Sequence, residues 1–444
     1  MFDKRLKIML ICFLLAIAAL VPGCSAPTTT EPEPVIEGEV TVSVNLESGV
    51  WSPEDELVFS NEYDLPICYT TDGAMPTADS VRYESPIMLK DIPQNKALTD
   101  HDEEMTLFDY HIYEYDGTTE ARVIRAAVVM PDGTMGPVMT KTYFLMDDLS
   151  ERYGCAVISI VTDPYNLYDY EKGILVKGKL YDEYLAENGG QPPQNEWEGK
   201  GNYSIKGRDW ERPAYIQMFD GSNKAEWESP CGIRVRGSAS RVYTQRSFNI
   251  YFREDYGQKK LEYDLIPGNQ SIDGKPINTY KNFSLRNGGN DTMSLKFRDD
   301  LIQDLFSGMR FSTQYSRPAI VYLNGEYYGI FSLIEKYDGR YVEDHYGVDS
   351  DNVIIIEDGV LDEGEDSDIT MFEQLMNTYG FSDIDLTDPD KWKAFCDVVD
   401  VQSMADYYAA EIYIANADWA DFDNCRLWRA RTNDGTEYGD TRWR

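Results

Sequence analysis

The pattern of hydrophobic residues changes near position 150, and this change limits the folds that the chain can adopt. Before it, short alternating runs such as 40–46 and 121–130 are typical of β-strands joined by Gly and Asp turns. After it, strand-like runs come first, and helical spacing dominates later, over 371–379 and 391–417. This order predicts a multidomain protein in which a β-sandwich precedes an α+β domain of two lobes.

The N-terminus has the pattern of a secretory signal that ends in a lipid-modified cysteine. A basic start at 4–7 is followed by an apolar run from Ile8 to Val21. The sequence Val21-Pro22-Gly23-Cys24 then resembles a bacterial lipobox, in which Cys24 would carry the lipid. An ordinary cleaved signal or an uncleaved anchor is the alternative, although the run is short for a membrane span. We therefore expect the protein on the outer side of a bacterial cell membrane, anchored through Cys24.

A linker separates this signal from the folded part. Residues 25–38 contain Pro, Thr and Glu without apolar periodicity, which is typical of an extended, solvated tether. We therefore expect a signal peptide over 1–24, this linker, a β-sandwich over 39–148 and the α+β domain over 152–444.

The charge of the chain restricts its partners. The formal net charge is −37, and 42% of the residues are hydrophobic. This apolar content supports packed cores, and so acidic a surface repels nucleic acid. A soluble surface exposed to the outside world explains this charge, and attraction of basic protein substrates or divalent cations is the alternative. The five cysteines after Cys24 occur singly, with no CxxC pair, which argues against a structural zinc site.

One motif in the first half carries a resemblance. The segment Tyr69–Pro76 has the sequence YTTDGAMP. It resembles the signature of fibronectin-III-like modules of the chitobiase/hexosaminidase C-terminal type. Such modules are accessory, so the resemblance implies that Asp72 forms a tight turn, and it leaves contact with cell-wall glycans open as a role. We interpret the acid-rich stretch 90–115, which contains His101 and His111, as an inserted loop rather than a metal site.

Two clusters in the second half combine cations with tight turns. A strand-like run ending at Arg236 leads into Gly237-Ser238, and a second strand returns with Arg246. A turn of small residues can approach phosphates closely, and cations on the strands can neutralise them. Further on, 283–291 places polar residues at a Gly-Gly bend, and 294–306 has helical spacing of Leu and Phe. An ordinary turn and a buried hydrogen-bond network are the alternatives for these clusters.

Two later clusters contain acids. Glu335 ends the second arm of a hairpin that turns at Asn324-Gly325, a strong hairpin signal, and its carboxylate can pair with a strand cation. Asp418 and Asn424 lie six positions apart in a loop after the last helical run. Phosphoryl transfer requires such a loop, in which an acid accepts a hydroxyl proton and an amide holds a metal ion. A helix-terminal loop of turn-forming residues is the alternative.

Taken in order, the four clusters resemble the CotH (spore-coat-protein-H) kinase family of secreted atypical protein kinases. The matching blocks lie within about 156–444 and have the sequences IRVRGSASR…QRSFNIYF, LRNGGND…FRD, VYLNGEYYGIFSLIEKYD and NADWADFDNCRLWR. The resemblance implies transfer of phosphate from ATP to Ser or Thr of extracellular or coat proteins, with Mg²⁺ or another divalent cation.

The resemblance also implies roles for individual residues. Asp418 matches the catalytic-loop acid, and Asn424 matches the metal-ligating amide. Glu335 matches the acid that pairs with the nucleotide-contacting cation, which is normally lysine, and Arg246 stands at that position. Arginine is bulkier and forked, so this exchange is not conservative. The expected nucleotide site comprises Arg236, Ser238, Arg246 and Glu335.

The sequence ends in Thr441-Arg442-Trp443-Arg444, which has the pattern of the middle of a strand. We therefore expect a kinase-like domain that is incomplete at its C-terminus and impaired as given. The alternative is a non-catalytic surface protein, either a pseudokinase or a glycan-binding protein. A glycosidase is neither supported nor excluded, because acidic residues occur throughout the chain.

Overall fold

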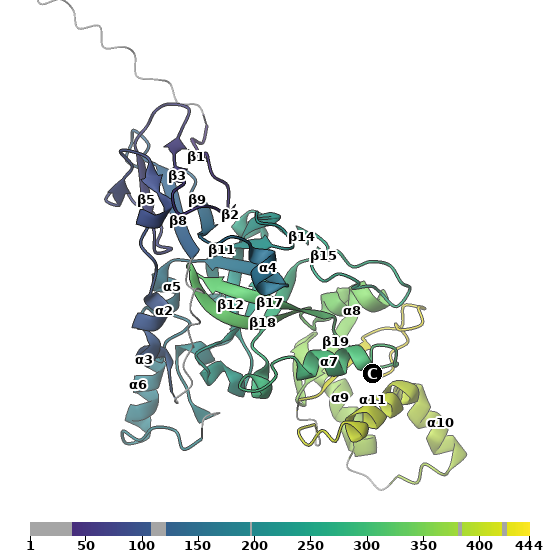
Figure 1. The fold of residues 1–444 in the computed structure, drawn as a ribbon. Helices are drawn as coiled ribbons and strands as arrows, with labels where there is room; N and C mark the ends of the chain where they lie inside the picture. Colours follow the sequence, from purple (N-terminus) through teal and green to yellow (C-terminus); the bar gives the residue numbers. More distant parts are fainter. Residues whose placement is uncertain (1–37, 108–120, 196–197, 381–383, 420–423) are drawn as a thin grey trace, which may run out of the picture. The chain divides into compact units, whose positions relative to one another are not determined.

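The computed structural model describes residues 38–107, 121–195, 198–380, 384–419 and 424–444 (Figure 1). The predicted signal segment with Cys24, and nearly all of the linker, lie outside the described residues. Residues Thr41–Arg444 form one compact unit. Within the described ranges, no helix is both long and apolar enough to cross a membrane.

The predicted β-rich module is present at the start of this unit. Its main sheet has the strand order β2-β9-β8-β5-β6, and two short strand pairs accompany it. In the turn after β5, Asp72 accepts a hydrogen bond from the N–H of Ala74, and Gly73 takes a φ of +92°. The strands are β1 Ser43–Val44, β2 Gly49–Val50, β3 Glu56–Leu57, β4 Phe59–Ser60, β5 Ile67–Thr70, β6 Val81–Arg82, β7 Ile87–Met88, β8 Ala121–Val128 and β9 Met139–Phe144.

The stretch interpreted as an inserted loop contains two short helices, α2 (Ala97–Asp100) and α3 (Asp102–Met105). They form because Leu98 and Met105 are buried in the core of the following domain. His101 stacks on Tyr168 instead of joining a metal cluster. His111 lies outside the described residues.

A closed barrel of seven strands follows, in the order β10-β11-β12-β13-β16-β18-β17. All neighbours pair antiparallel except β10 and β17, whose parallel pairing closes the barrel. The two-lobed arrangement expected from the sequence is not confirmed. Alternation of residues identifies strands, but it does not show which pair of strands closes a sheet. The strands are β10 Ala156–Val161, β11 Arg212–Phe219, β12 Trp227–Arg236, β13 Ser247–Tyr251, β16 Asn282–Arg286, β17 Ser316–Leu323 and β18 Glu326–Ile334.

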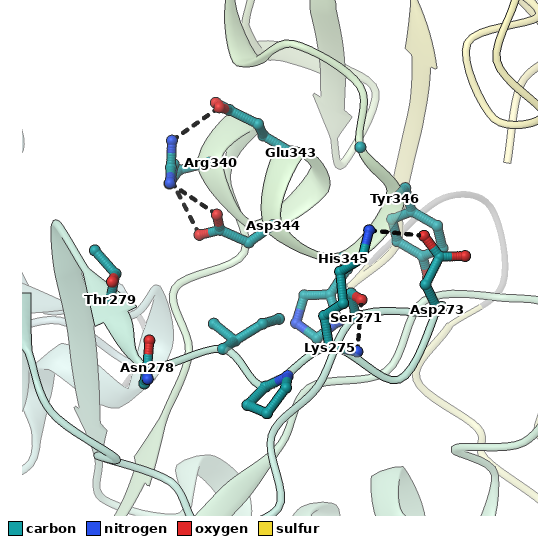
Figure 2. A pocket seen from close by; sticks show the side chains of 13 residues that line it. Ser271, Asp273, Lys275, Asn278, Thr279, Arg340, Glu343, Asp344, His345 and Tyr346 are labelled. Atoms are coloured by element: carbon teal, nitrogen blue, oxygen red, sulfur yellow. Dashed lines mark hydrogen bonds and ion pairs between the residues drawn. The ribbon is translucent and has the colours of Figure 1, made fainter.

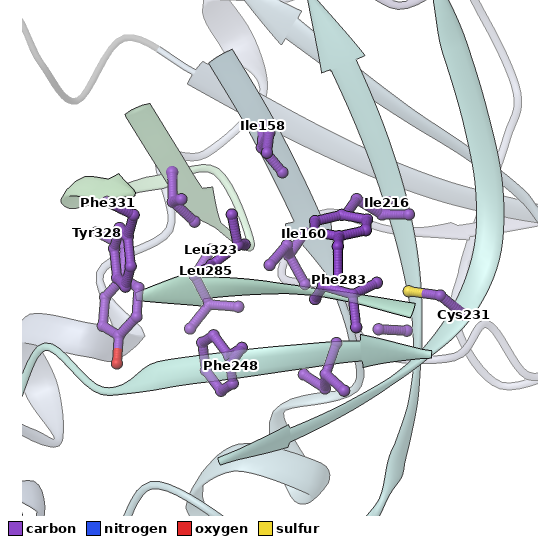
Figure 3. Packing of buried hydrophobic residues seen from close by; sticks show 14 of the residues in the cluster. Ile158, Ile160, Ile216, Cys231, Phe248, Phe283, Leu285, Leu323, Tyr328 and Phe331 are labelled. Carbon is purple, nitrogen blue, oxygen red and sulfur yellow. The ribbon is translucent and has the colours of Figure 1, made fainter. Parts of the chain in front are cut away.

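Alternation along these strands separates the barrel interior from an outer face that is polar on β12, β13, β16 and β18. On β10 and β17 the outer face is apolar, and Val157, Ile320 and Tyr322 pack there with Ala121 and Phe144. The interior side chains pack into one core (Figure 3). Each fully buried aliphatic or aromatic side chain stabilises the fold by about 1.5–3 kcal/mol relative to its exposed state. Core positions of the four strands β12, β13, β16 and β18 include Ile233, Val235, Phe248, Ile250, Phe283, Leu285, Phe331 and Leu333.

The hairpin of β17 and β18 confirms a sequence prediction. Its turn residues Asn324 and Gly325 take φ values of +50° and +85°. Positive φ at both turn positions suits the right-handed twist of the two arms, which explains the Asn-Gly pair.

A small sheet with the order β20-β19-β21 forms the second core of the domain. On one face, Ile355 and Trp428 pack against α8; on the other, Ile354 and Ile356 pack against α9. The elements are α8 Gly339–Tyr346, β19 Val353–Glu357, β20 Val360–Glu363, α9 Ile369–Leu375 and β21 Arg426–Ala430.

Further helices and one strand pair connect these parts. The helix α6 contains no buried residue among those that the structure describes. The remaining elements are α4 Leu149–Tyr153, α5 Pro164–Tyr168, α6 Gly178–Glu187, β14 Leu261–Glu262, β15 Thr279–Tyr280, α7 Arg298–Leu305, α10 Pro389–Val398 and α11 Val401–Tyr413.

A buried carboxylate, Asp400, joins α11 to the last described residues. Both of its oxygens accept hydrogen bonds from Nε of Arg310, at 3.1 and 3.0 Å, and its Oδ1 caps α11 through the N–H of Ser403. Nε of Arg444, which is itself buried, lies 3.3 Å from Oδ2. The backbone of Arg444 exchanges two hydrogen bonds with Trp428 of β21. Nη2 of Arg442 lies 3.8 Å from Oδ2 of Asp400, so Asp400 balances three cations while positioning the start of α11.

We predict that Asp400→Asn lowers the free energy of unfolding by about 3 kcal/mol, because it removes a buried carboxylate charge and leaves Arg310 and Arg444 with only their more exposed partners, Glu437 and Asp440. Denaturant unfolding measures this. Asp397→Asn is the control, since Asp397 pairs with Lys393 on the exposed surface of α10, and we expect a loss below about 0.5 kcal/mol. Equal losses in both variants would contradict the role of Asp400.

Candidate functional site

The polar outer face of strands β12, β13, β16 and β18 is the first component of the site. Alternation places polar side chains outward wherever their neighbours point into the core. The helix α7 packs on this face through acids: Asp299 pairs with Arg286, and Asp300 accepts a hydrogen bond from Ser332. The outward residues are Arg234, Arg236, Asn249, Ser284, Arg286 and Ser332.

Three arginines gather where this face meets the small sheet. Arg286 pairs with Asp299, and Arg426, the first residue of β21, pairs with Glu357. Among the described residues Arg236 forms no ion pair, and its Nη1 is buried without a hydrogen bond. Burial, followed by repulsion from Arg286 and Arg426, lowers the pKa of Arg236 to about 9. Keeping the Arg236 guanidinium charged is therefore energetically unfavourable, and a bound anion would offset this penalty.

The loop with the predicted catalytic residues lies beside this cluster along the chain. Asp418 is exposed after α11, and its backbone carbonyl accepts a hydrogen bond of 3.0 Å from Nδ2 of Asn424. Trp419 packs edge-on against Tyr407 and Tyr408 of α11, which fixes the start of the loop. Asn424 itself takes a φ of +53°. The structure thus brings Asp418 and Asn424 together, two residues before Arg426.

The turn between β19 and β20 holds the other end of this loop. Asp358 donates its N–H to the carbonyl of Cys425, and its Oδ1 accepts the N–H of Cys425 at 3.3 Å. Glu357, the residue before it, binds Arg426. The small sheet β20-β19-β21 therefore fixes the end of the loop 418–426 next to the arginines.

The expected pairing of Glu335 with Arg246 does not form. Glu335 is buried, and its Oε1 lies 2.8 Å from Nε2 of His345 and accepts a hydrogen bond of 2.9 Å from Asn269. Its Oε2 accepts the N–H of Tyr315 at 3.3 Å. These contacts connect β18 to α8, and they leave the carboxylate no strand cation to orient.

Arg246 has a different task from the one expected. Position 246 falls on the same side of the strand as Phe248, so its side chain enters the barrel core and is fully buried. Nε donates to the carbonyl of Arg241, and Nη2 donates to that of Met105, both at 2.8 Å. Its guanidinium carbon lies 4.3 Å from the ring centre of Tyr203, while Nη1 has no partner. Arg246 therefore ties the N-terminal module to the barrel, through α3.

The remaining predicted phosphate contact, Ser238, lies at the rim. It precedes a 3₁₀ turn, Ala239–Val242, is exposed, and makes no side-chain capping bond. Gly237 before it takes a φ of +114°, which favours glycine. Ser238 follows Arg236 by two residues, so the turn begins at the arginine cluster.

The side chains of the candidate site are suited to bind an anion. The described residues do not form a complete site for a cation. The described residues contain no group of three His, Cys, Asp or Glu placed to hold a metal ion. Asn424 uses its amide nitrogen on Asp418, so its amide oxygen is the atom left for a hard cation. Asp421 and Asp423 lie outside the described residues.

A separate cavity of about 380 Å³ lies between α8 and the segment 271–279 (Figure 2). Its charged groups are already paired: Arg340 binds Glu343 and Asp344, and Lys275 reaches Asp273. It contains neither the three clustered arginines, Arg236, Arg286 and Arg426, nor Asp418 and Asn424. We therefore take the arginine cluster, and not this cavity, as the candidate site.

Comparison with protein families identifies the domain that contains these residues. Residues 233–443 match the family described as CotH kinase protein, and residues 57–143 match the family described as Fn3 associated. The second half of the chain is a CotH kinase family domain. The suspected resemblance is therefore confirmed, with an Fn3-associated module before the CotH domain. No curated protein matches the chain.

Sequence reasoning missed two residues of the CotH domain. Arg286 lies within the LRNGGND block and Arg426 within the NCRLWR block, but neither was assigned a role. The available signal was a cation flanked by apolar residues on a strand. In such a strand the apolar neighbours face the core and the cation faces outward. That signal does not show that three such cations meet.

We predict that Arg246→Lys destabilises the protein by about 1–3 kcal/mol and leaves nucleotide affinity unchanged. A single ammonium cannot reach both carbonyls or stack on Tyr203 as the planar fork does. Thermal unfolding and nucleotide titration measure the two effects. A variant with unchanged stability and tighter nucleotide binding would show that the residue belongs to the nucleotide site.

We predict the opposite sign for Arg236→Met. Removing an unpaired, partly buried cation from beside two others should raise the free energy of unfolding by about 1–3 kcal/mol. Arg234→Met is the control on the same strand and the same face. Arg234 already donates to the hydroxyl of Tyr251 and stacks on its ring, so this change should destabilise the protein. Destabilisation by both variants would refute an unbalanced charge at Arg236.

Proposed function

We propose that this protein is a surface-anchored kinase that transfers the γ-phosphoryl group of ATP to Ser or Thr of a protein substrate. The observation that supports this most is Arg236, a cation without a carboxylate partner inside a three-arginine cluster. In a CotH kinase family domain, the polyphosphate of a nucleotide is the anion of the right charge for that cluster.

The chain's own residues then divide the work. Arg236, Arg286 and Arg426 bind the phosphate oxygens and stabilise the charge that spreads over them in the transition state. Asp418 accepts the proton of the substrate hydroxyl as the new O–P bond forms and the β–γ bridge bond breaks. ADP leaves with the bonding electrons of that bridge. Because Asp418 is exposed, a protein substrate can reach it.

Asn424 is the residue that would hold a divalent cation, through its amide oxygen. Such a cation, Mg²⁺ for example, neutralises phosphate charge when bound. Asn424 also fixes the backbone of Asp418 through its amide nitrogen. One side chain thereby links the orientation of the acid to the cation.

The charge of the chain suggests the substrate class. With a net charge of −37, the protein attracts basic proteins and repels acidic ones. We further propose that lipidation at Cys24 places the domain on the outer side of the cell membrane, where extracellular or coat proteins are within reach. Contact of the Fn3-associated module with cell-wall glycans is part of the same proposal.

Transfer of radiolabelled phosphate from ATP to a lysine-rich protein such as histone tests the reaction. We expect Asp418→Asn to lower turnover by about 10²–10⁴-fold with ATP affinity retained, because only the proton acceptor is lost. We expect Arg236→Met to weaken ATP binding by about 10–100-fold, the value of a charge-assisted hydrogen bond. Arg208→Met is the control, since Arg208 is 63% exposed in a surface pair.

Two results would contradict the proposal. The first is equal phosphate transfer by the wild type and Asp418→Asn. The second is ATP affinity that Arg236→Met leaves unchanged. ATP binding that depends on Arg236, without transfer to any basic protein, would instead favour the pseudokinase. The use of Arg246 for structure, where the family normally has lysine, is the observation that favours this second candidate.

A further inference from the structure

Helix α7 is amphipathic, but its polar side faces the protein and its apolar side faces solvent. Its polar residues face the barrel: Asp299 pairs with Arg286, Asp300 binds Ser332, and Gln303 accepts the N–H of Gln314. Its apolar stripe faces solvent. Phe297, Leu301 and Leu305 recur at intervals of four, so they lie on one side of the helix, and all three are exposed.

Helix α11 presents a second stripe of the same spacing. Ser403 and Ala410 are its buried positions. Met404, Tyr408 and Ile412 recur every four residues on another side and are exposed, Ile412 at 69%. Tyr413, at its last position, is 84% exposed. In a surface helix such an apolar stripe normally packs against the protein core.

Contacts at their ends join the two helices. The ring of Phe306, next to Leu305, meets the ring of Tyr413 edge-on at 6.4 Å between centroids. The N–H of Arg310 donates to Asp406 of α11 at 2.9 Å. The two stripes therefore adjoin, and we call them together the α7–α11 surface. Contiguous apolar surface of this kind marks a binding site in soluble proteins.

The charges of the two helices identify the partner. They contain one basic residue, Arg298, against five acidic ones. Of the acids, Asp304 and Glu411 form no ion pair with a described residue. A second copy would bring the same acids face to face, on chains that each carry −37, and this disfavours self-association.

We propose that the α7–α11 surface binds an amphipathic helix with a basic polar face, supplied by another protein. A helix that lays its apolar stripe across two others completes a three-helix packing, and its lysines or arginines would lie near Asp304 and Glu411. The surface lies next to the candidate site, because α7 carries Asp299 and α11 leads directly into Asp418. The proposal does not require phosphoryl transfer.

The test uses an 18-residue Leu/Lys peptide, with Leu at helical spacing, labelled for fluorescence anisotropy against the purified chain. We expect micromolar binding, weakened at least about 10-fold by Leu301→Asp or Ile412→Asp. The controls are a Leu/Glu peptide of the same pattern, which should not bind, and Val81→Asp, at an exposed apolar position in the Fn3-associated module.

The sign of the effect separates docking from general charge attraction. Each Asp substitution makes the chain more negative, so attraction by charge alone would strengthen binding of the Leu/Lys peptide. Unchanged or tighter binding by Leu301→Asp and Ile412→Asp would overturn the proposal. So would a dimer of the wild type, in light scattering, that Leu305→Asp dissociates, because the occupant would then be a second copy.

Discussion

Closure of the seven-stranded barrel is the constraint on which the rest of the structure depends. Once β10 and β17 pair in parallel, every strand residue must point either into the core or outward, with no edge left. Phe248 and Leu285 fill the interior, and their neighbours are thereby directed out. Arg236 and Arg286 stand on this outer face because the core has taken the alternate positions.

The same alternation explains why Arg246, one of the two expected residues that lie outside the candidate site, is buried. Position 246 shares its side of the strand with Phe248, so a long cation there must enter the core. It can do so because carbonyls of Arg241 and Met105 are within reach and the ring of Tyr203 covers the guanidinium. The consequence is that Arg246 fixes the N-terminal module to the barrel. An accessory domain has become part of the domain's packing.

Charge imbalance is concentrated at the same end of these strands but on their outer face, where Arg236 is paired with Ser247, the residue after Arg246. Two of the three clustered arginines have carboxylate partners, and Arg236 has none. A protein selected for stability alone would fill that place with an apolar side chain or add an acid. Retaining an unpaired cation there is consistent with an anion that completes the site in the working state. Folding and binding thus favour different residues at one position.

The sequence by itself determined the local elements and their order: the β-rich module, the Asn324-Gly325 hairpin, the helical spacing of α7 and α11, and the loop with Asp418 and Asn424. It could do so because turn chemistry and hydrophobic period are local properties. It did not lead us to predict α6, although Leu180, Tyr181, Tyr184 and Leu185 recur at helical spacing there. Only the tertiary structure decided which strands close the barrel, that Arg236, Arg286 and Arg426 meet, that Glu335 binds His345, and that the apolar stripe of α7 faces solvent. These outcomes depend on pairings across tens to hundreds of residues, and a period along the chain shows which residues share a face but not what that face contacts.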